Sequence, residues 1–173
     1  MIGRNVEIKA RLGEFERARR AAVKVSDSGP THIFQEDTYF RCAKGRLKLR
    51  KFAETSGQLI CYDRGDSTEP AECNYSIAPT SEPDMLRAVL GQALGIRGVV
   101  RKNRELYLSG ETRIHLDGVE GLGHFVELEV VLKPGQSRAD GERIAAELMK
   151  ELSISDADLI AGGYIDLIVE DTA

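Results

Sequence analysis

Strict alternation of apolar and charged residues is the feature that most constrains how this chain can fold. In residues 4–12, Val6 and Ile8 would occupy one face of an extended strand, and Glu7 and Lys9 the other. Successive side chains of a strand point to opposite faces, so this period of two predicts a strand with one apolar and one charged face. The same alternation recurs in residues 35–41, 46–52, 58–64, 72–78, 99–108, 112–118 and 124–132. The sequence therefore predicts eight strands.

Apolar residues at helical spacing predict three helices, over residues 13–25, over residues 82–94 and after Ser137. Ser137 opens a Ser-Arg-Ala-Asp segment that resembles a capping box, which marks a helix start. Eight strands and three helices indicate an α+β protein that is mainly β. An even number of antiparallel strands can close into a barrel, which removes the exposed sheet edges. With short loops and no repeat, residues 1–173 are expected to form a single domain.

The composition of the chain limits the kinds of molecule that the protein is expected to bind. The chain has 28 acidic and 24 basic residues, a net charge of -4, which excludes a surface tuned as a whole to nucleic acid or to an anionic membrane. No stretch approaches the roughly 20 apolar residues of a membrane helix. Three cysteines without CxxC spacing encode neither a disulfide framework nor a zinc ribbon. We therefore expect a cytoplasmic protein with no nucleic-acid and no membrane partner.

Charges cluster by sign along individual strands. Residues 41–51 hold six basic residues and no acid, and Arg46, Lys48 and Arg50 share one strand face. Like charges on neighbouring positions of a sheet repel, so this face indicates a bound anion. Carboxylates cluster in the same way on the strand over residues 124–132, which indicates a bound cation.

Two placements of these charged faces remain open. They could face water, with the apolar faces packed inside, or line an interior, with the apolar faces covered by helices. An interior with basic and acidic walls would bind a nucleoside triphosphate or inorganic polyphosphate together with magnesium or manganese. A weaker alternative is a nucleic-acid binder that uses residues 41–51.

Several short motifs, in a fixed order, resemble those of the CYTH superfamily, the triphosphate tunnel metalloenzymes. The first is NVEIK at residues 5–9, similar to the family's ExExK signature with Asn5 in place of the first Glu. The others are QEDTYF at 35–40, LKLR at 47–50, LICYDR at 59–64, KNR at 102–104, IHLD at 114–117 and GLGHFVELE at 121–129. The specificity of the resemblance lies in this ordered set.

The resemblance implies a fold and an activity. The fold would be an eight-stranded antiparallel barrel that forms a charged tunnel, with helices packed outside. The activity would be divalent-metal-dependent cleavage of a small-molecule triphosphate, and the pattern is most similar to the class IV adenylyl cyclases, which convert ATP to cyclic AMP and pyrophosphate. Alternatives are a hydrolase of inorganic tripolyphosphate, nucleoside triphosphate or thiamine triphosphate, and a non-catalytic polyphosphate- or nucleotide-binding module.

Roles follow from the resemblance position by position. The residues implied in substrate binding are Lys48, Arg50, Arg64, Lys102 and Arg104, with Arg113 and Arg46 as additions. The implied ligands of Mg2+ or Mn2+ are Glu7, Glu127 and Glu129, and the catalytic candidates are Lys9 and Asp117. Asn5 removes one carboxylate, which would weaken the metal site or reduce it to one ion. His115 shares a strand face with Arg113 and Asp117 and could line the tunnel, although a hydrogen-bonded structural role is favoured. Gly163, where the family has Ser, puts a tunnel-closing role of that segment in doubt.

Overall fold

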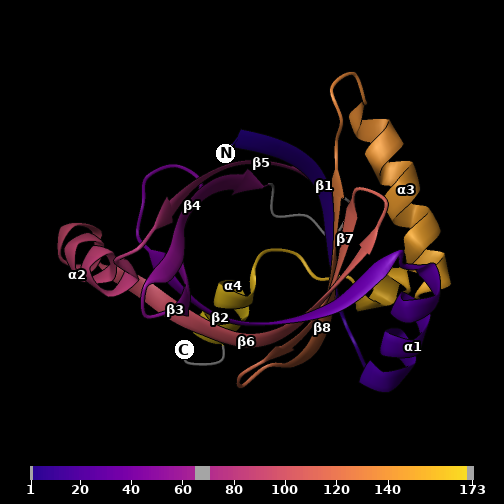
Figure 1. The fold of residues 1–173 in the computed structure, drawn as a ribbon, viewed down its shortest axis with the longest axis horizontal. Coiled ribbons are helices and arrows are strands. Elements are labelled where there is room, and N and C mark those ends of the chain that lie inside the picture. The colour runs from indigo at the N-terminus through magenta and orange to yellow at the C-terminus, as the bar shows by residue number, and fades with distance from the viewer. Residues whose placement is uncertain (1, 65–70, 171–173) are drawn as a thin grey trace.

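The computed structural model describes residues 2–64 and 71–170, and its main feature is a closed barrel of eight antiparallel strands (Figure 1). The strands are β1 (Ile2–Arg11), β2 (Ser28–Phe40), β3 (Arg46–Ala53), β4 (Ser56–Arg64), β5 (Ala71–Thr80), β6 (Ile96–Ser109), β7 (Thr112–Val119) and β8 (Gly123–Val131). Their order around the barrel is β1-β5-β4-β3-β2-β6-β7-β8. The predicted fold class and closed barrel are confirmed.

The register of the strands places the apolar and charged faces as the alternation requires. On β1, Val6 and Ile8 are fully buried on the outer face of the barrel, where they join a core with residues of the helices. The opposite face of the same strand carries Glu7 and Lys9, which line an interior cavity. Of the two placements left open by the sequence, the charged interior is the one observed.

Three helices cover the outside of the barrel at the predicted places. The helices α1 (Phe15–Val25) and α3 (Arg138–Glu151) pack beside β1, β7 and β8, and α2 (Pro83–Leu94) packs against β2, β3 and β4 (Figure 1). Ser137 and Asp140 form the predicted capping box at the start of α3. The larger core therefore lies between the barrel wall and α1 and α3, outside the interior cavity.

A short C-terminal helix, α4 (Tyr164–Glu170), follows a single 3-10 turn, η1 (Asp156–Asp158). Tyr164 and Ile165 are buried in a second core with Tyr39, Val100 and Phe125. Gly163 and Tyr164 line the interior cavity, so this segment lies against the tunnel. Whether it has the closing role that the family pattern implies stays open.

The strand β2 is longer than the alternation predicts. It begins at Ser28, well before the start predicted at residue 35, and Ser28 pairs with Leu108 of β6. Residues 28–32 are exposed on both faces, so no apolar period marks them as a strand. Within residues 2–64 and 71–170, no helix has the length and apolar character needed to cross a membrane.

Candidate active site: a charged tunnel

The barrel encloses a cavity of about 780 Å3, which includes space open to solvent. The predicted site residues on its wall are Glu7, Lys9, Arg46, Lys48, Arg50, Lys102, Arg104, Arg113, Glu127 and Glu129. The fold therefore brings ten predicted residues from five strands to one cavity, while their roles stay predictions. The side chain of Arg64 lies outside the described part of the chain.

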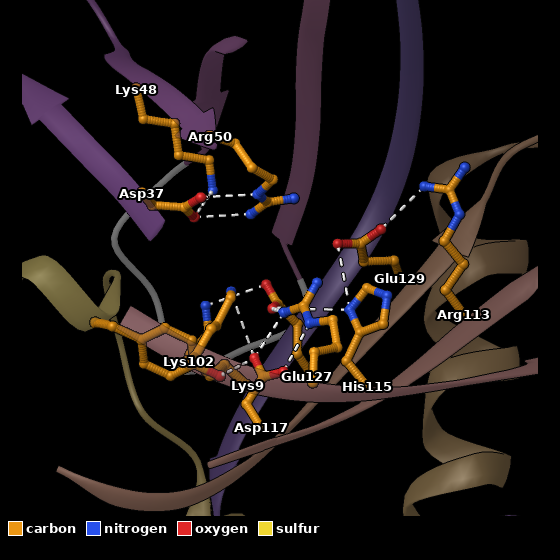
Figure 2. A network of polar contacts seen from close by, with 12 residues as sticks. Lys9, Asp37, Lys48, Arg50, Lys102, Arg113, His115, Asp117, Glu127 and Glu129 are labelled. Atoms are coloured by element: carbon orange, nitrogen blue, oxygen red, sulfur yellow. Dashed lines mark hydrogen bonds and ion pairs between the residues drawn. The ribbon is translucent and has the colours of Figure 1, made fainter. Parts of the chain in front are cut away.

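The cations of β3 are held by a buried carboxylate on β2. The Arg50 guanidinium donates from Nε and Nη2 to the two oxygens of Asp37, both at 2.8 Å, and Lys48 Nζ donates to Oδ2 at 3.1 Å (Figure 2). The Asp37 side chain is only 1% exposed. Burial alone would raise the pKa of Asp37, but Arg50 and Lys48 hold it well below its ordinary value. Asp37 therefore fixes the orientation of both cations.

The cations of β6 surround a second buried carboxylate, Asp117. Arg104 Nε and Nη2 donate to its two oxygens at 2.6 Å, and the Tyr164 hydroxyl donates to Oδ2 at 2.9 Å. Asp117 is 0% exposed and lies behind Arg104, off the cavity wall. Burial opposes its ionisation, but Arg104 and Lys102 lower the pKa of Asp117 below its ordinary value. Its catalytic role stays a prediction; in the structure it orients the Arg104 guanidinium.

Lys102 is a buried lysine that is influenced by both a neighbouring carboxylate, Asp117, and a neighbouring cation, Arg104. Its Nζ lies 3.5 Å from the nearest Asp117 oxygen, and its side chain is 3% exposed. Burial and the neighbouring Arg104 charge lower the pKa of Lys102 to about 7, and Asp117 only partly opposes them. An anion in the cavity would favour the charged ammonium, so ligand binding and protonation of Lys102 are coupled.

Carboxylates and cations alternate across β7, β8 and β1. Glu127 lies between His115 and Lys9 in the register of the three strands. One Glu127 oxygen accepts from Lys9 Nζ at 3.1 Å and the other from Arg104 Nη2 at 2.7 Å. Both oxygens of Glu127 therefore contact cations. Burial alone would raise the pKa of Glu127, but Lys9, His115 and Arg104 hold it well below its ordinary value.

Glu129 lies in the next row, between Arg113 of β7 and Glu7 of β1. The Arg113 guanidinium donates to Glu129 Oε2 at 3.1 Å. Two carboxylates directly opposite each other on adjacent strands repel, which is unfavourable without a cation nearby. The Glu7–Glu129 pair is therefore a part of the wall where a cation is favourable.

The residues around Glu129 fit a divalent cation. One ligand atom from each of His115, Glu127 and Glu129 lies within 4.8 Å of the others. Carboxylate oxygens and an imidazole nitrogen are ligands that Mn2+ accepts, and carboxylates suit Mg2+. Asn5 also lines this region, and within the described residues its buried Oδ1 has no hydrogen-bond partner. A cation is thus compatible with the donor set, although Asn5 supplies no charge.

The wall formed by β4 and β5 differs from the rest. Ile60 pairs with Ile77, and Tyr62 pairs with Tyr75, and all four side chains line the cavity. This apolar and aromatic wall faces an interior that is otherwise charged. It provides a surface for an organic group attached to an anionic one.

The basic run at residues 41–51 is divided between the two sides of the barrel. Arg46, Lys48 and Arg50 line the cavity. Lys51 lies on the outside, where its Nζ pairs with Asp84 of α2 at 2.6 Å. The run is therefore not one continuous cationic surface, which removes the sequence argument for nucleic-acid binding through it.

The family model of the CYTH domain matches residues 3–164. The chain belongs to the CYTH domain family. It is 26% identical over 171 residues to MJ0240 of Methanocaldococcus jannaschii, named as a candidate adenylate cyclase, covering 94% of this chain and 97% of that protein. The PH1012 protein of Pyrococcus horikoshii has the same fold, with a TM-score of 0.82, 23% identity and coverage of 94% and 98% of the two chains. HpAC1 of Hippeastrum, a candidate adenylyl cyclase, is similar with a TM-score of 0.65, 17% identity and coverage of 97% and 95%.

Sequence reasoning missed two residues of this CYTH site and left the role of a third, His115, open. Asp37 stands in the QEDTYF motif, but the charge pattern of a single strand does not show that it pairs with the cations of β3. Tyr164 reaches the site from a helix 47 residues beyond its partner Asp117. His115 was expected to be hydrogen-bonded, yet its buried Nδ1 has no hydrogen-bond partner among the residues that the structure describes.

Proposed function

We propose that this protein is a divalent-metal-dependent enzyme that binds ATP in its tunnel and converts it to cyclic AMP and pyrophosphate, as class IV adenylyl cyclases do. The observation that carries the proposal is one cavity whose wall combines the cations of β3 and β6 with the carboxylates of β8. Such a wall complements a triphosphate with its metal ion. Membership of the CYTH family and the name of the Methanocaldococcus relative support the same chemistry.

The basic residues would bind the phosphates in two ways. Arg50 and Arg104 present planar guanidinium groups held in place by Asp37 and Asp117. A planar guanidinium can donate two parallel hydrogen bonds to phosphate oxygens, whereas the ammonium of Lys102 acts as a point charge. Preoriented cations of this kind stabilise the negative charge that spreads over the transferring phosphoryl group.

The carboxylates would hold the metal. Glu129 and Glu127, with Glu7 opposite Glu129, are the candidate ligands for Mg2+ or Mn2+. When bound, such an ion neutralises phosphate charge and orients the reacting oxygens. Lys9, beside Glu127, would place its ammonium next to the same phosphates.

In the cyclase reaction a ribose hydroxyl oxygen bonds to the α-phosphorus, while the bond from that phosphorus to the bridging oxygen breaks. Pyrophosphate leaves with the electron pair of the broken bond, and the hydroxyl proton passes to water in the cavity. Lys9 would act as a cation beside the phosphates, and Asp117 through the Arg104 guanidinium that it orients. The aromatic wall made by Tyr62 and Tyr75 supports an organic substituent beside the phosphates. It favours a nucleoside triphosphate over inorganic tripolyphosphate.

A second candidate is triphosphate hydrolysis, in which water bonds to the terminal phosphorus and orthophosphate is released. HpAC1, which has the same fold, is described as having a dominant triphosphatase activity. The same cations and carboxylates would serve this reaction, since only the aligned nucleophile differs.

Product analysis separates these reactions. The protein is incubated with ATP and either Mn2+ or Mg2+, with tripolyphosphate in parallel, and products are resolved by ion-exchange chromatography. Cyclic AMP with pyrophosphate is expected, whereas ADP with orthophosphate would identify a hydrolase.

Two variants on β6 provide the matched comparison. Arg104→Met removes a cation from the cavity, whereas Arg101→Met removes one from the outer face, where Arg101 pairs with Glu36. Activity should fall at least 100-fold in the first and remain within about twofold in the second, by analogy with loss of one preoriented donor. Turnover of no triphosphate by the unmodified protein would refute the enzyme, and tight metal-independent binding without turnover would identify a binding module.

A further inference from the structure

His115 occupies an unusual position on the carboxylate side of the tunnel. Its side chain comes from β7, is 3% exposed and lies between Glu127 and Glu129 (Figure 2). Nδ1 is 3.6 Å from Glu129 Oε1 and 3.9 Å from Glu127 Oε2. These separations exceed hydrogen-bond distance, which is about 2.7–3.2 Å for a ring nitrogen and an oxygen. Within the described residues this nitrogen therefore has carboxylates around it but no hydrogen bond.

A buried ring nitrogen without a hydrogen bond is energetically unfavourable, whether or not it carries a proton. With a proton, Nδ1 would form a hydrogen bond only if a carboxylate moved closer; without one, its lone pair faces oxygen lone pairs. A neutral imidazole is the form that binds metals. A cation shared by the three side chains removes the conflict.

The distances also suit a shared ion. Ligand atoms about 2.0–2.2 Å from one metal lie roughly 3–4.4 Å from each other. Both separations from His115 Nδ1 fall in this interval. The largest separation among the three ligand atoms is within 4.8 Å, so a small side-chain movement completes the site.

We propose that His115 Nδ1 is a direct ligand of the divalent cation, together with Glu129 and Glu127, and that it gives the site a preference for Mn2+ over Mg2+. This inference rests on the proposed function only in that the tunnel takes a divalent cation. Imidazole nitrogen is a good ligand for first-row transition metals, whereas Mg2+ takes oxygen ligands. The nitrogen ligand also compensates in part for Asn5, which brings no carboxylate to this wall.

Electron paramagnetic resonance with Mn2+ alone, without nucleotide, tests the ligand directly. A bound imidazole nitrogen produces a 14N coupling in the electron spin-echo modulation of Mn2+, and this coupling should change when histidine is labelled with 15N. We expect the coupling in the unmodified protein. His115→Asn should abolish it, and His124→Asn should retain it, because His124 stacks on Phe15 outside the tunnel cavity.

Affinity gives the second readout. Mn2+ affinity of His115→Asn should fall about 10- to 100-fold, whereas Mg2+ affinity, measured by competition with Mn2+, should change less than about threefold. Far-UV circular dichroism verifies the fold of each variant. If His115→Asn does not fold, the coupling of the unmodified protein and its response to 15N-histidine still decide the question.

The outcomes separate this inference from the proposed function. Absence of 14N coupling in the unmodified protein, absence of Mn2+ binding, or persistence of the coupling in His115→Asn overturns the role of His115. If the same preparation still converts ATP with Mg2+, the proposed function stands without it. Conversely, nitrogen-ligated Mn2+ without turnover of any triphosphate supports the ligand and refutes the enzyme.

Discussion

Replacing Asp37 with asparagine should destabilise the protein far more than removal of a comparable surface carboxylate. Asp37 is almost completely buried and bonds Arg50 twice and Lys48 once. Removing one partner of a buried ion pair costs about 3–5 kcal/mol, because the other charge stays buried. The Arg50 and Lys48 side chains are each 13% exposed, so water in the cavity would offset part of this loss. We expect a decrease of about 3 kcal/mol in the free energy of unfolding.

Asp84→Asn is the matched control, because Asp84 also binds a lysine, Lys51, but is 63% exposed. An exposed pair contributes less than about 1 kcal/mol. Urea unfolding is followed by far-UV circular dichroism, since the chain has no tryptophan. With a slope of about 2 kcal/mol/M, Asp37→Asn should lower the midpoint by about 1.5 M.

The difference in the free energy of unfolding between the unmodified protein and Asp37→Asn should depend on pH in one direction. The pKa of Asp37 is held below its ordinary value, so its stabilising contribution is complete above about pH 4–5 and is lost as the pH falls through the folded-state pKa. The gap between the unmodified protein and Asp37→Asn should therefore be constant near neutrality and narrow on acidification. Equal losses in Asp37→Asn and Asp84→Asn at pH 7 would refute the idea that Asp37 anchors the cations.

Three further changes test other parts of the structure. Glu129→Gln should abolish metal-dependent activity while circular dichroism shows an unchanged fold, because it removes charge but little volume; an unchanged rate would contradict the metal role. Binding of ATP at pH 8 should take up protons, because an anion raises the pKa of Lys102 from about 7; calorimetry in buffers of different ionisation enthalpy measures this, and Lys102→Met should remove the uptake. Gly141→Ala should lower the free energy of unfolding by about 1–3 kcal/mol, because the added methyl would lie 2.6 Å from Val6 and 2.9 Å from Leu132; full stability in urea would show that α3 can shift.

The alternation of the sequence predicted which residues share each strand face, but it left open whether the charged faces line the interior or face water. Lys48 and Arg50 illustrate this: Leu49 between them points to the opposite face, so the two cations share one face. The alternation could not predict which strands are neighbours. Asp37 lies opposite Arg50 only because β2 pairs with β3, and this pairing is a property of the closed barrel.

Contacts that depend on three-dimensional position were also beyond the sequence. The Tyr164 hydroxyl reaches Asp117 because α4 packs against Phe125 and Val100 at one part of the tunnel. Whether His115 has a hydrogen-bond partner depends on the placement of two glutamates on the neighbouring strand, within fractions of an ångström. The family pattern places these residues in order, but their separations come only from the structure.

The position of β1 in the barrel sets the order in which the chain can complete its fold during synthesis. β1 is hydrogen-bonded to β5 on one side and to β8 on the other, and the Lys9–Glu127 contact spans 118 residues. A ribosome makes the chain from its N-terminus, so one edge of β1 stays unpaired until residue 131 has emerged. Exposed strand edges invite aggregation, and charges along them oppose it. Glu7 and Lys9 of β1, which line the tunnel in the folded protein, should therefore also oppose aggregation of the nascent chain before β1 pairs with β8.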